Sequence, residues 1–207
     1  MNTKKSLSED VYEDLKQKIL FNHLHPGDLL AESVLVNQYF ISRTPIRQAL
    51  KKLEDRGLVV IKDGVGTFVT YISPTDVRNA YEIRNAIEKI AIRTSIYNIQ
   101  TEALEMLENE FHALKKQFSR GGYGAPLDKV AQIDWALHDL IVTKSDNSFL
   151  PIISERIDLI LRRYQYANAS TFERAIDEHL EIVSYIKARD LEKATQALDN
   201  HIQFKPI

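Results

Sequence analysis

Apolar residues recur at helical spacing in three segments of the first 56 residues. Ser6 and Glu9 precede the first segment at the spacing of a capping box, which indicates that a helix begins there. A Pro-Gly turn over residues 25–28 separates this helix from a short one over residues 32–39. A third helix begins near residues 43–45, because proline fits the first turn of a helix. The apolar stripes are Val11, Leu15 and Ile19; Val34 and Leu35; and Ile46, Leu50 and Leu53.

A hairpin pattern follows the third helix. Apolar and β-prone residues over 58–61 and 67–71 flank a turn that contains Gly64 and Gly66. Two such runs around a short glycine-rich turn predict a pair of antiparallel strands. Two helices, a turn, a third helix and a hairpin form the order of a winged helix-turn-helix, which we predict for residues 1–72.

The rest of the chain shows amphipathic helices separated by short breaks, one of them rich in glycine over residues 121–126. Pro74 disfavours helix at the residue before it, so we place the joint between two domains at residues 71–75. The second domain, residues 73–207, is predicted to be an all-α antiparallel helical bundle, and the fold class is mostly α. Six apolar stripes predict six helices: Ile83, Ile87, Ile90 and Tyr97; Leu104, Leu107, Phe111, Leu114 and Phe118; Val130, Ile133, Leu137 and Leu140; residues 149–166; Ile176, Leu180, Val183 and Ile186; and Leu191, Ala194, Leu198 and Ile202.

Composition excludes several classes of protein. The 207 residues include no cysteine, which rules out disulfide frameworks, thiolate zinc sites and cysteine nucleophiles. No apolar run approaches the ~18 residues of a membrane span. The polar start does not resemble a signal peptide, so we expect a cytoplasmic protein without a membrane partner. The formal net charge is −2, so contact with nucleic acid requires a local basic patch.

Such a patch lies on the third helix. Residues 43–56 contain five basic side chains and two acidic ones. Arg43, Thr44 and Arg47 gather at the amino end, the part of a recognition helix that meets base edges. Arginine can donate two hydrogen bonds to guanine, and the turn ending at Gly66 can bring backbone close to the minor groove. The alternative is a solvated basic helix face, which the order of the surrounding elements disfavours.

These motifs resemble the winged helix of GntR-type bacterial transcription regulators. The matching runs are PGDxL at residues 26–30, SRTPIRQALxxLExxGL at residues 42–58 and GxFV at residues 66–69. The resemblance implies that Arg43, Thr44, Arg47 and Gly66 contact double-stranded operator DNA, and it favours a repressor. The chain departs from the family pattern at Ser33, where some relatives have an arginine that touches DNA.

Three histidines and one aspartate of the second domain fall on inward positions. Asp134 and His138 are four residues apart and therefore share one helix face. His179 and His201 lie on the apolar rows of the last two helices, at similar distances from the corner between them, so their imidazoles return to about the same level. This arrangement predicts a divalent-metal site. A lone histidine is more often a hydrogen-bonded core residue, and we assign no role to His23, His25 and His112.

The same positions resemble the FCD effector-binding domain of the FadR branch. The matching features are DxxxH at residues 134–138, Asp146-Asn147, Glu178-His179 and His201, and six helices suggest the shorter, VanR-like subgroup. The resemblance implies that Asp134, His138, His179 and His201 bind a metal, zinc or nickel. It also implies that Arg84 pairs with a carboxylate of the effector. The alternative for Arg84 is an exposed ion pair with Glu88, four residues away.

Together these features predict a homodimeric, metabolite-responsive transcription regulator that is not an enzyme. A small carboxylate metabolite would enter the helical domain and shift the balance between forms that bind DNA and forms that do not. Two alternatives stay open at this point. One is a metal-dependent hydrolase or lyase, in which an Asp/His₃ site activates water. The other is a purely structural metal that stiffens the bundle.

Overall fold

The computed structural model describes residues 6–119, 127–167 and 172–204. The chain divides into two compact units, Met1–Ser73 and Pro74–Ile207. The division predicted from the sequence lies one residue earlier. The predicted break at residues 121–126 lies outside the described residues.

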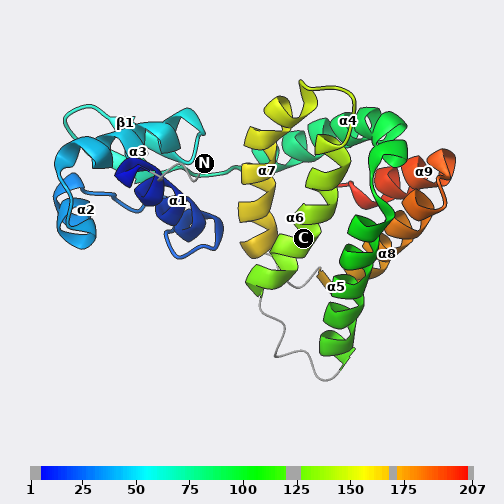
Figure 1. Ribbon diagram of the computed structural model, residues 1–207. Coiled ribbons are helices and arrows are strands. Elements are labelled where there is room, and N and C mark those ends of the chain that lie inside the picture. Colours follow the sequence, from blue (N-terminus) through cyan, green and yellow to red (C-terminus); the bar gives the residue numbers. More distant parts are fainter. Residues whose placement is uncertain (1–5, 120–126, 168–171, 205–207) are drawn as a thin grey trace. The chain divides into compact units, whose positions relative to one another are not determined.

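The first unit is a three-helix domain with a two-stranded hairpin (Figure 1). The helix α3 packs against both α1 and α2, and it contacts β1. The strands are antiparallel, with Val59 opposite Val69 and Lys62 opposite Gly66. This is the predicted winged helix-turn-helix, and it is confirmed. The elements are α1 (Leu7–Leu20), α2 (Glu32–Tyr39), α3 (Arg43–Asp55), β1 (Val59–Lys62) and β2 (Gly66–Val69).

Capping and an ion pair hold α1 in place. Ser6 Oγ accepts a hydrogen bond from the backbone N–H of Glu9 at 3.2 Å, which satisfies one of the unpaired amides of the first turn. The carboxylate of Glu9 accepts from Lys52 Nζ on α3 at 2.7 Å. The Glu9 side chain, which belongs to the predicted capping box, therefore ties α1 to α3.

Gly66 lies at the turn end of the hairpin, opposite Lys62. Its φ is +146°, and a Cβ added there would lie 2.7 Å from Leu29 Cδ1. Leu29 also forms an isolated antiparallel bridge with Phe68. A residue with a Cβ at position 66 would therefore be strained at this φ and would push the Leu29 side chain aside.

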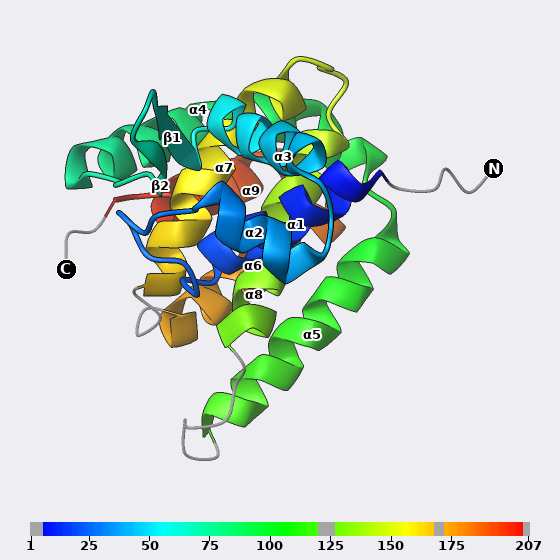
Figure 2. The same ribbon diagram turned by 90° about the vertical axis from the view of Figure 1, so that its left-hand side faces the viewer.

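The second unit is a bundle of six helices within the described residues (Figure 1; Figure 2). The longest, α4, packs against α6, α7 and α9, while α5 packs against α8 and α6. The core includes Ile141, Ile182 and Leu198, which are fully buried. The helices are α4 (Pro74–Asn98), α5 (Thr101–Ser119), α6 (Leu127–Thr143), α7 (Leu150–Ala167), α8 (Phe172–Lys187) and α9 (Leu191–His201). None of the described helices is both long enough and apolar enough to cross a membrane.

Most of the apolar stripe that predicted α4 lies on the surface of the helix and not on its core face. Ile83, Ile90 and Tyr97 are exposed, and only Ile87 of that stripe is buried. The buried face instead includes the charged residues Arg84 and Glu88. Periodicity locates the helix correctly, but it cannot distinguish a core face from a second apolar face on the surface.

Phe40 closes α2 in a strained backbone conformation. Its φ is +56° and its side chain is 93% exposed, so little apolar burial offsets the cost of the left-handed region.

We expect Phe40→Gly to raise the free energy of unfolding by about 0.5–1 kcal/mol, because glycine adopts positive φ without a Cβ clash. Phe40→Ala is the matched control: it removes the ring but keeps the clash, and should stay within about 0.5 kcal/mol of the parent. Urea unfolding followed by circular dichroism measures both variants. A glycine variant no more stable than the alanine variant would contradict the strain.

Candidate functional site

The amino end of α3 presents the residues predicted to meet DNA. Arg43, Thr44 and Arg47 are exposed, whereas Ile46 and Leu50 pack inward. Ser42 occupies the N-cap position, but its side chain makes no capping hydrogen bond. The structure therefore places the three polar residues together on the outer face of this helix, next to its N-terminus.

Arg47 is held by an acidic residue of α2. Its Nε donates to both carboxylate oxygens of Glu32 at 2.9 Å. Neither Nη of Arg47 is hydrogen-bonded within the described residues, so the outer edge of the guanidinium is available. The pattern over residues 32–39 predicted the helix but not this ion pair. The signal available in the sequence was an acidic residue in the first turn of the helix that packs on α3.

Three of the five basic residues in this stretch form ion pairs: Arg47 with Glu32, as described above, and two lysines farther along α3. Lys51 forms ion pairs with Glu54 at 2.8 Å and Asp55 at 3.4 Å. Lys52 pairs with Glu9 at 2.7 Å. The basic patch is therefore narrower than the sequence suggests, and it concentrates at the amino end of α3.

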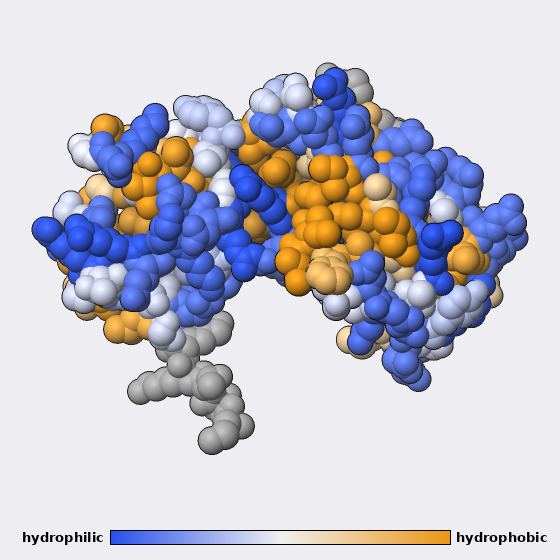
Figure 3. Space-filling view, turned by 90° about the horizontal axis from the view of Figure 1, so that it is seen from above, coloured by the Kyte–Doolittle hydropathy of each residue, from blue (hydrophilic) through white to orange (hydrophobic). Residues whose placement is uncertain are grey.

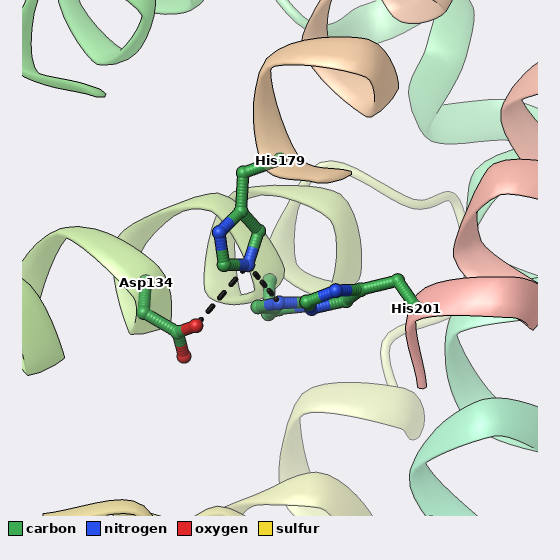
Figure 4. Close-up of side chains that lie close together, drawn as sticks. Asp134, His179 and His201 are labelled. Atoms are coloured by element: carbon green, nitrogen blue, oxygen red, sulfur yellow. Dashed lines mark hydrogen bonds and ion pairs between the residues drawn. The ribbon is translucent and has the colours of Figure 1, made fainter. Parts of the chain in front are cut away.

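The second site is a cluster inside the helical unit. Asp134 and His138 come from α6, His179 from α8 and His201 from α9. Each offers one ligand atom, and these atoms all lie within 4.8 Å of one another. The first three residues are 1–3% exposed, and the His201 side chain is 10% exposed. Figure 4 shows Asp134, His179 and His201 pointing toward one another.

The spacing of the ligand atoms fits a single ion. His179 Nε2 lies 3.1 Å from Asp134 Oδ1 and 3.3 Å from His138 Nε2. Two ligand atoms at about 2.0–2.1 Å from one tetrahedral ion are separated by about 3.3 Å. The three atoms are therefore close to the separations that shared coordination requires.

Two buried polar atoms in this cluster have no hydrogen-bond partner in the described residues. They are Asp134 Oδ2 and His179 Nδ1. Burying a carboxylate oxygen without a partner is costly, and a cation between the ligands would offset that cost. The residues present therefore fit a divalent ion.

The protonation states suit metal binding as well. Burial raises the pKa of Asp134, but the nearby His179, His138 and Arg84 outweigh burial and hold this pKa well below its usual range. Burial, assisted by Arg84, lowers the pKa of His138 well below its usual value, and burial and His179 lower that of His201. The aspartate is therefore an anion, and these two imidazoles are neutral.

Further carboxylates hold two of the imidazoles. Glu88 Oε1 and Oε2 lie 2.9 and 2.7 Å from His138 Nδ1. Glu178 Oε2 lies 2.8 Å from His201 Nδ1. An Nδ1–H that donates to a carboxylate leaves Nε2 as the lone-pair nitrogen. The sequence indicated Glu88 only as a partner of Arg84, because spacing along the chain does not show that α4 packs against α6 at this level.

Arg84 forms the ion pair with Glu88 that the sequence offered as the alternative, at 2.6 Å. The pair is not exposed as that alternative expected, because Arg84 is buried at 6% exposure. Burial alone would lower its pKa, whereas Glu88, Asp134 and Asp158 raise it, so the guanidinium stays charged. Its Nη atoms make no hydrogen bond within the part of the chain that the structure describes.

Arg84 and Glu88 line a small pocket beside the cluster, together with His138, Ser154 and Asp158. Burial raises the pKa of Asp158 to about 6, although the nearby Arg84 counteracts it. The pocket therefore joins a potential metal ligand, a guanidinium and two carboxyl groups.

Two family models match the chain. The model of bacterial regulatory proteins of the gntR family matches residues 7–69, and the FCD domain matches residues 79–204. The chain belongs to the GntR family. It is a transcription regulator with an FCD effector-binding domain, which confirms the resemblance and the fold class inferred from the sequence. GntR-family members bind operator DNA and are not enzymes.

Curated relatives extend over nearly the whole chain. The HTH-type transcriptional regulator YdhC of Bacillus subtilis is 29% identical over 193 residues, covering 92% of this chain and 85% of the relative. The HTH-type transcriptional repressor RspR of Escherichia coli is 27% identical over 206 residues, covering 98% and 89%.

Solved structures share the fold. Escherichia coli McbR/YncC superposes with a TM-score of 0.79 at 20% identity, covering 96% of this chain and 94% of that one. A GntR transcriptional regulator from Rhodococcus superposes with a TM-score of 0.74 at 19% identity, with the same coverage. The architecture of this GntR-family chain therefore recurs in proteins of distant sequence.

Proposed function

We propose that this chain is a homodimeric repressor whose operator binding is controlled by a divalent ion and a small organic acid in the FCD domain. The observation that supports it most is the buried cluster of Asp134, His138, His179 and His201, with a carboxylate oxygen that has no protein partner in the described residues. Repression is supported by relatives named as repressors, RspR and the gluconate operon transcriptional repressor of Bacillus licheniformis.

For operator binding, we assign base recognition to Arg47 and Arg43. The outer edge of Arg47 suits a guanine, because two parallel N–H groups match its major-groove acceptors. Thr44 and the N-terminus of α3 suit a phosphate. Gly66, at the start of β2, would bring backbone to the minor groove. All four residues would meet one duplex if α3 occupies the major groove.

For the effector, we assign Arg84 to a carboxylate. A guanidinium with both Nη atoms available is well suited to bidentate carboxylate binding. A bound zinc or nickel ion would supply positive charge and open coordination positions to a second oxygen of the effector. The residues of the chain itself orient the ligand: Arg84 from α4 and Asp158 from α7 face the same pocket.

For the dimer, we assign the exposed apolar face of α4 and α7. These helices pack against each other, and the large apolar side chains exposed on or beside them are Ile83, Ile90, Tyr97, Phe149, Ile152 and Ile153. Figure 3 shows a broad apolar area on the helical unit, over the helices that lie uppermost there in Figure 1. A contiguous apolar patch of this kind marks a protein interface.

The DNA assignment predicts that Arg47→Ala weakens specific operator binding by about 1–3 kcal/mol. The operator would be selected by the parent protein from a random duplex library, and affinities measured by fluorescence anisotropy at fixed salt. Arg93→Ala, an equal loss of charge on an exposed residue of α4, is the control and should bind normally. Equal affinities for all three proteins would count against the recognition-helix assignment.

The metal assignment predicts about one zinc or nickel ion per chain after reloading of chelator-treated protein, measured by mass spectrometry. His179→Ala combined with His201→Ala should abolish uptake, whereas His112→Ala, on an exposed position, should not. Metal bound to the native state alone should also raise the melting temperature. A double variant with an undiminished metal ratio refutes the site. Metal that stabilises the fold without altering operator binding supports the purely structural alternative instead.

The dimer assignment predicts that Ile90→Glu shifts the protein to monomers in sedimentation velocity, because a charge would be buried at the centre of the apolar face. Met106→Glu on α5 is the control, since Met106 is also an exposed apolar residue at 71%. Dimers of unchanged stability in the Ile90→Glu variant would exclude this face.

A further inference from the structure

Glu88 is shared between two groups of different function. Its Oε1 accepts from Arg84 Nε at 2.6 Å, and both of its oxygens lie within 2.9 Å of His138 Nδ1. The carboxylate is 1% exposed and lines the pocket. One buried side chain therefore contacts both the arginine assigned to the effector and an imidazole assigned to the metal.

We propose that Glu88 is a positioning residue that couples the effector arginine to the metal site, so that occupancy of one changes the affinity of the other. The inference rests on the proposed function of the same pocket. It adds a route by which an anion at Arg84 and an ion between the histidines affect each other's binding.

The contact with Glu88 orients the imidazole ring of His138. When His138 Nδ1–H donates to Glu88, the ring is fixed with Nε2 facing His179 and Asp134. Carboxylates in this position orient a ligating histidine and strengthen it as a donor. His201 has the same arrangement with Glu178, whereas Arg84 donates through Nε to Glu88.

One oxygen of Glu88, Oε1, contacts both Arg84 and His138. Because Oε1 faces both the guanidinium and the imidazole, a movement of Arg84 toward an anion in the pocket changes the charge that Glu88 presents to His138. Coupling between two binding sites is reciprocal, so the ion must affect Arg84 by the same factor. Glu178, which contacts His201 Nδ1 at 2.8 Å, provides an internal comparison at the other imidazole.

The first measurement is the affinity of the full-length apo protein for Zn²⁺ alone, by competition with a chromogenic chelator. Glu88→Gln should weaken it about 10- to 100-fold and should change the absorption spectrum of bound Co²⁺, because ligand geometry changes. The melting temperature of each apo variant checks that the fold is intact. An unchanged Zn²⁺ affinity and Co²⁺ spectrum would overturn the positioning role.

The second measurement is a double-mutant cycle. Arg84→Gln should tighten Zn²⁺ binding about threefold or more, because Glu88 then acts on His138 alone. The change should persist in the Glu178→Gln background and disappear in the Glu88→Gln background. Arg84→Met is a second neutral variant if Arg84→Gln is unstable. The same change in all three backgrounds, or none in the parent, would overturn the coupling.

The measurements distinguish a failure of the proposed metal site from a failure of the role of Glu88. Parent protein that takes up no Zn²⁺ contradicts the proposed function itself. Parent protein that binds Zn²⁺ as tightly as the Glu88→Gln variant leaves the proposed function intact and overturns the role of Glu88.

Discussion

The helical unit depends on compensating charge that is buried in its core. Asp134, Glu88 and Arg84 are all at most 6% exposed, and removing one partner of such a group typically costs about 3–5 kcal/mol. Apolar residues of similar volume at these positions would avoid the free-energy cost of removing charges from water. Arg84 and Glu88 compensate each other on α4, Glu88 also contacts His138 of α6, and Asp134 contacts His179 of α8. The arrangement of α4, α6 and α8 therefore fixes the geometry of these charges.

This compensation is incomplete, because some buried polar atoms of the cluster keep no hydrogen-bond partner within the described residues. These atoms suggest which ligands the unit could bind. Asp134 Oδ2 and His179 Nδ1 are buried without a hydrogen-bond partner in the described segments, which is an expensive state for a carboxylate. Arg84 lines the pocket, and its Nη atoms make no hydrogen bond within the described segments. The proposed cation beside Asp134 and the proposed anion at Arg84 would compensate the carboxylate and the guanidinium respectively.

Much of the fold followed from local patterns, and much of the site did not. Spacing along the chain placed Asp134 and His138 on one face and returned His179 and His201 to one level, because both relations depend only on helix geometry. It did not predict Glu88 beside His138, since that contact depends on how α4 crosses α6. It also misassigned the apolar stripe of α4, where Ile83 and Ile90 face outward. Packing between helices is the information that periodicity lacks.

The two arginines assigned to ligands share one arrangement despite very different surroundings. Arg47 donates through Nε to Glu32 at the surface, and Arg84 donates through Nε to Glu88 in the core. In each case the carboxylate holds the inner edge of the guanidinium and leaves the Nη edge for a planar acceptor, a guanine or a carboxylate. An exposed pair of this kind contributes only about 0–1 kcal/mol to stability. Stability therefore does not account for Glu32, and orientation of Arg47, the arginine that we assign to base recognition, is the stronger explanation. In the core the same geometry also neutralises a buried charge, so there orientation and stability depend on the same contact.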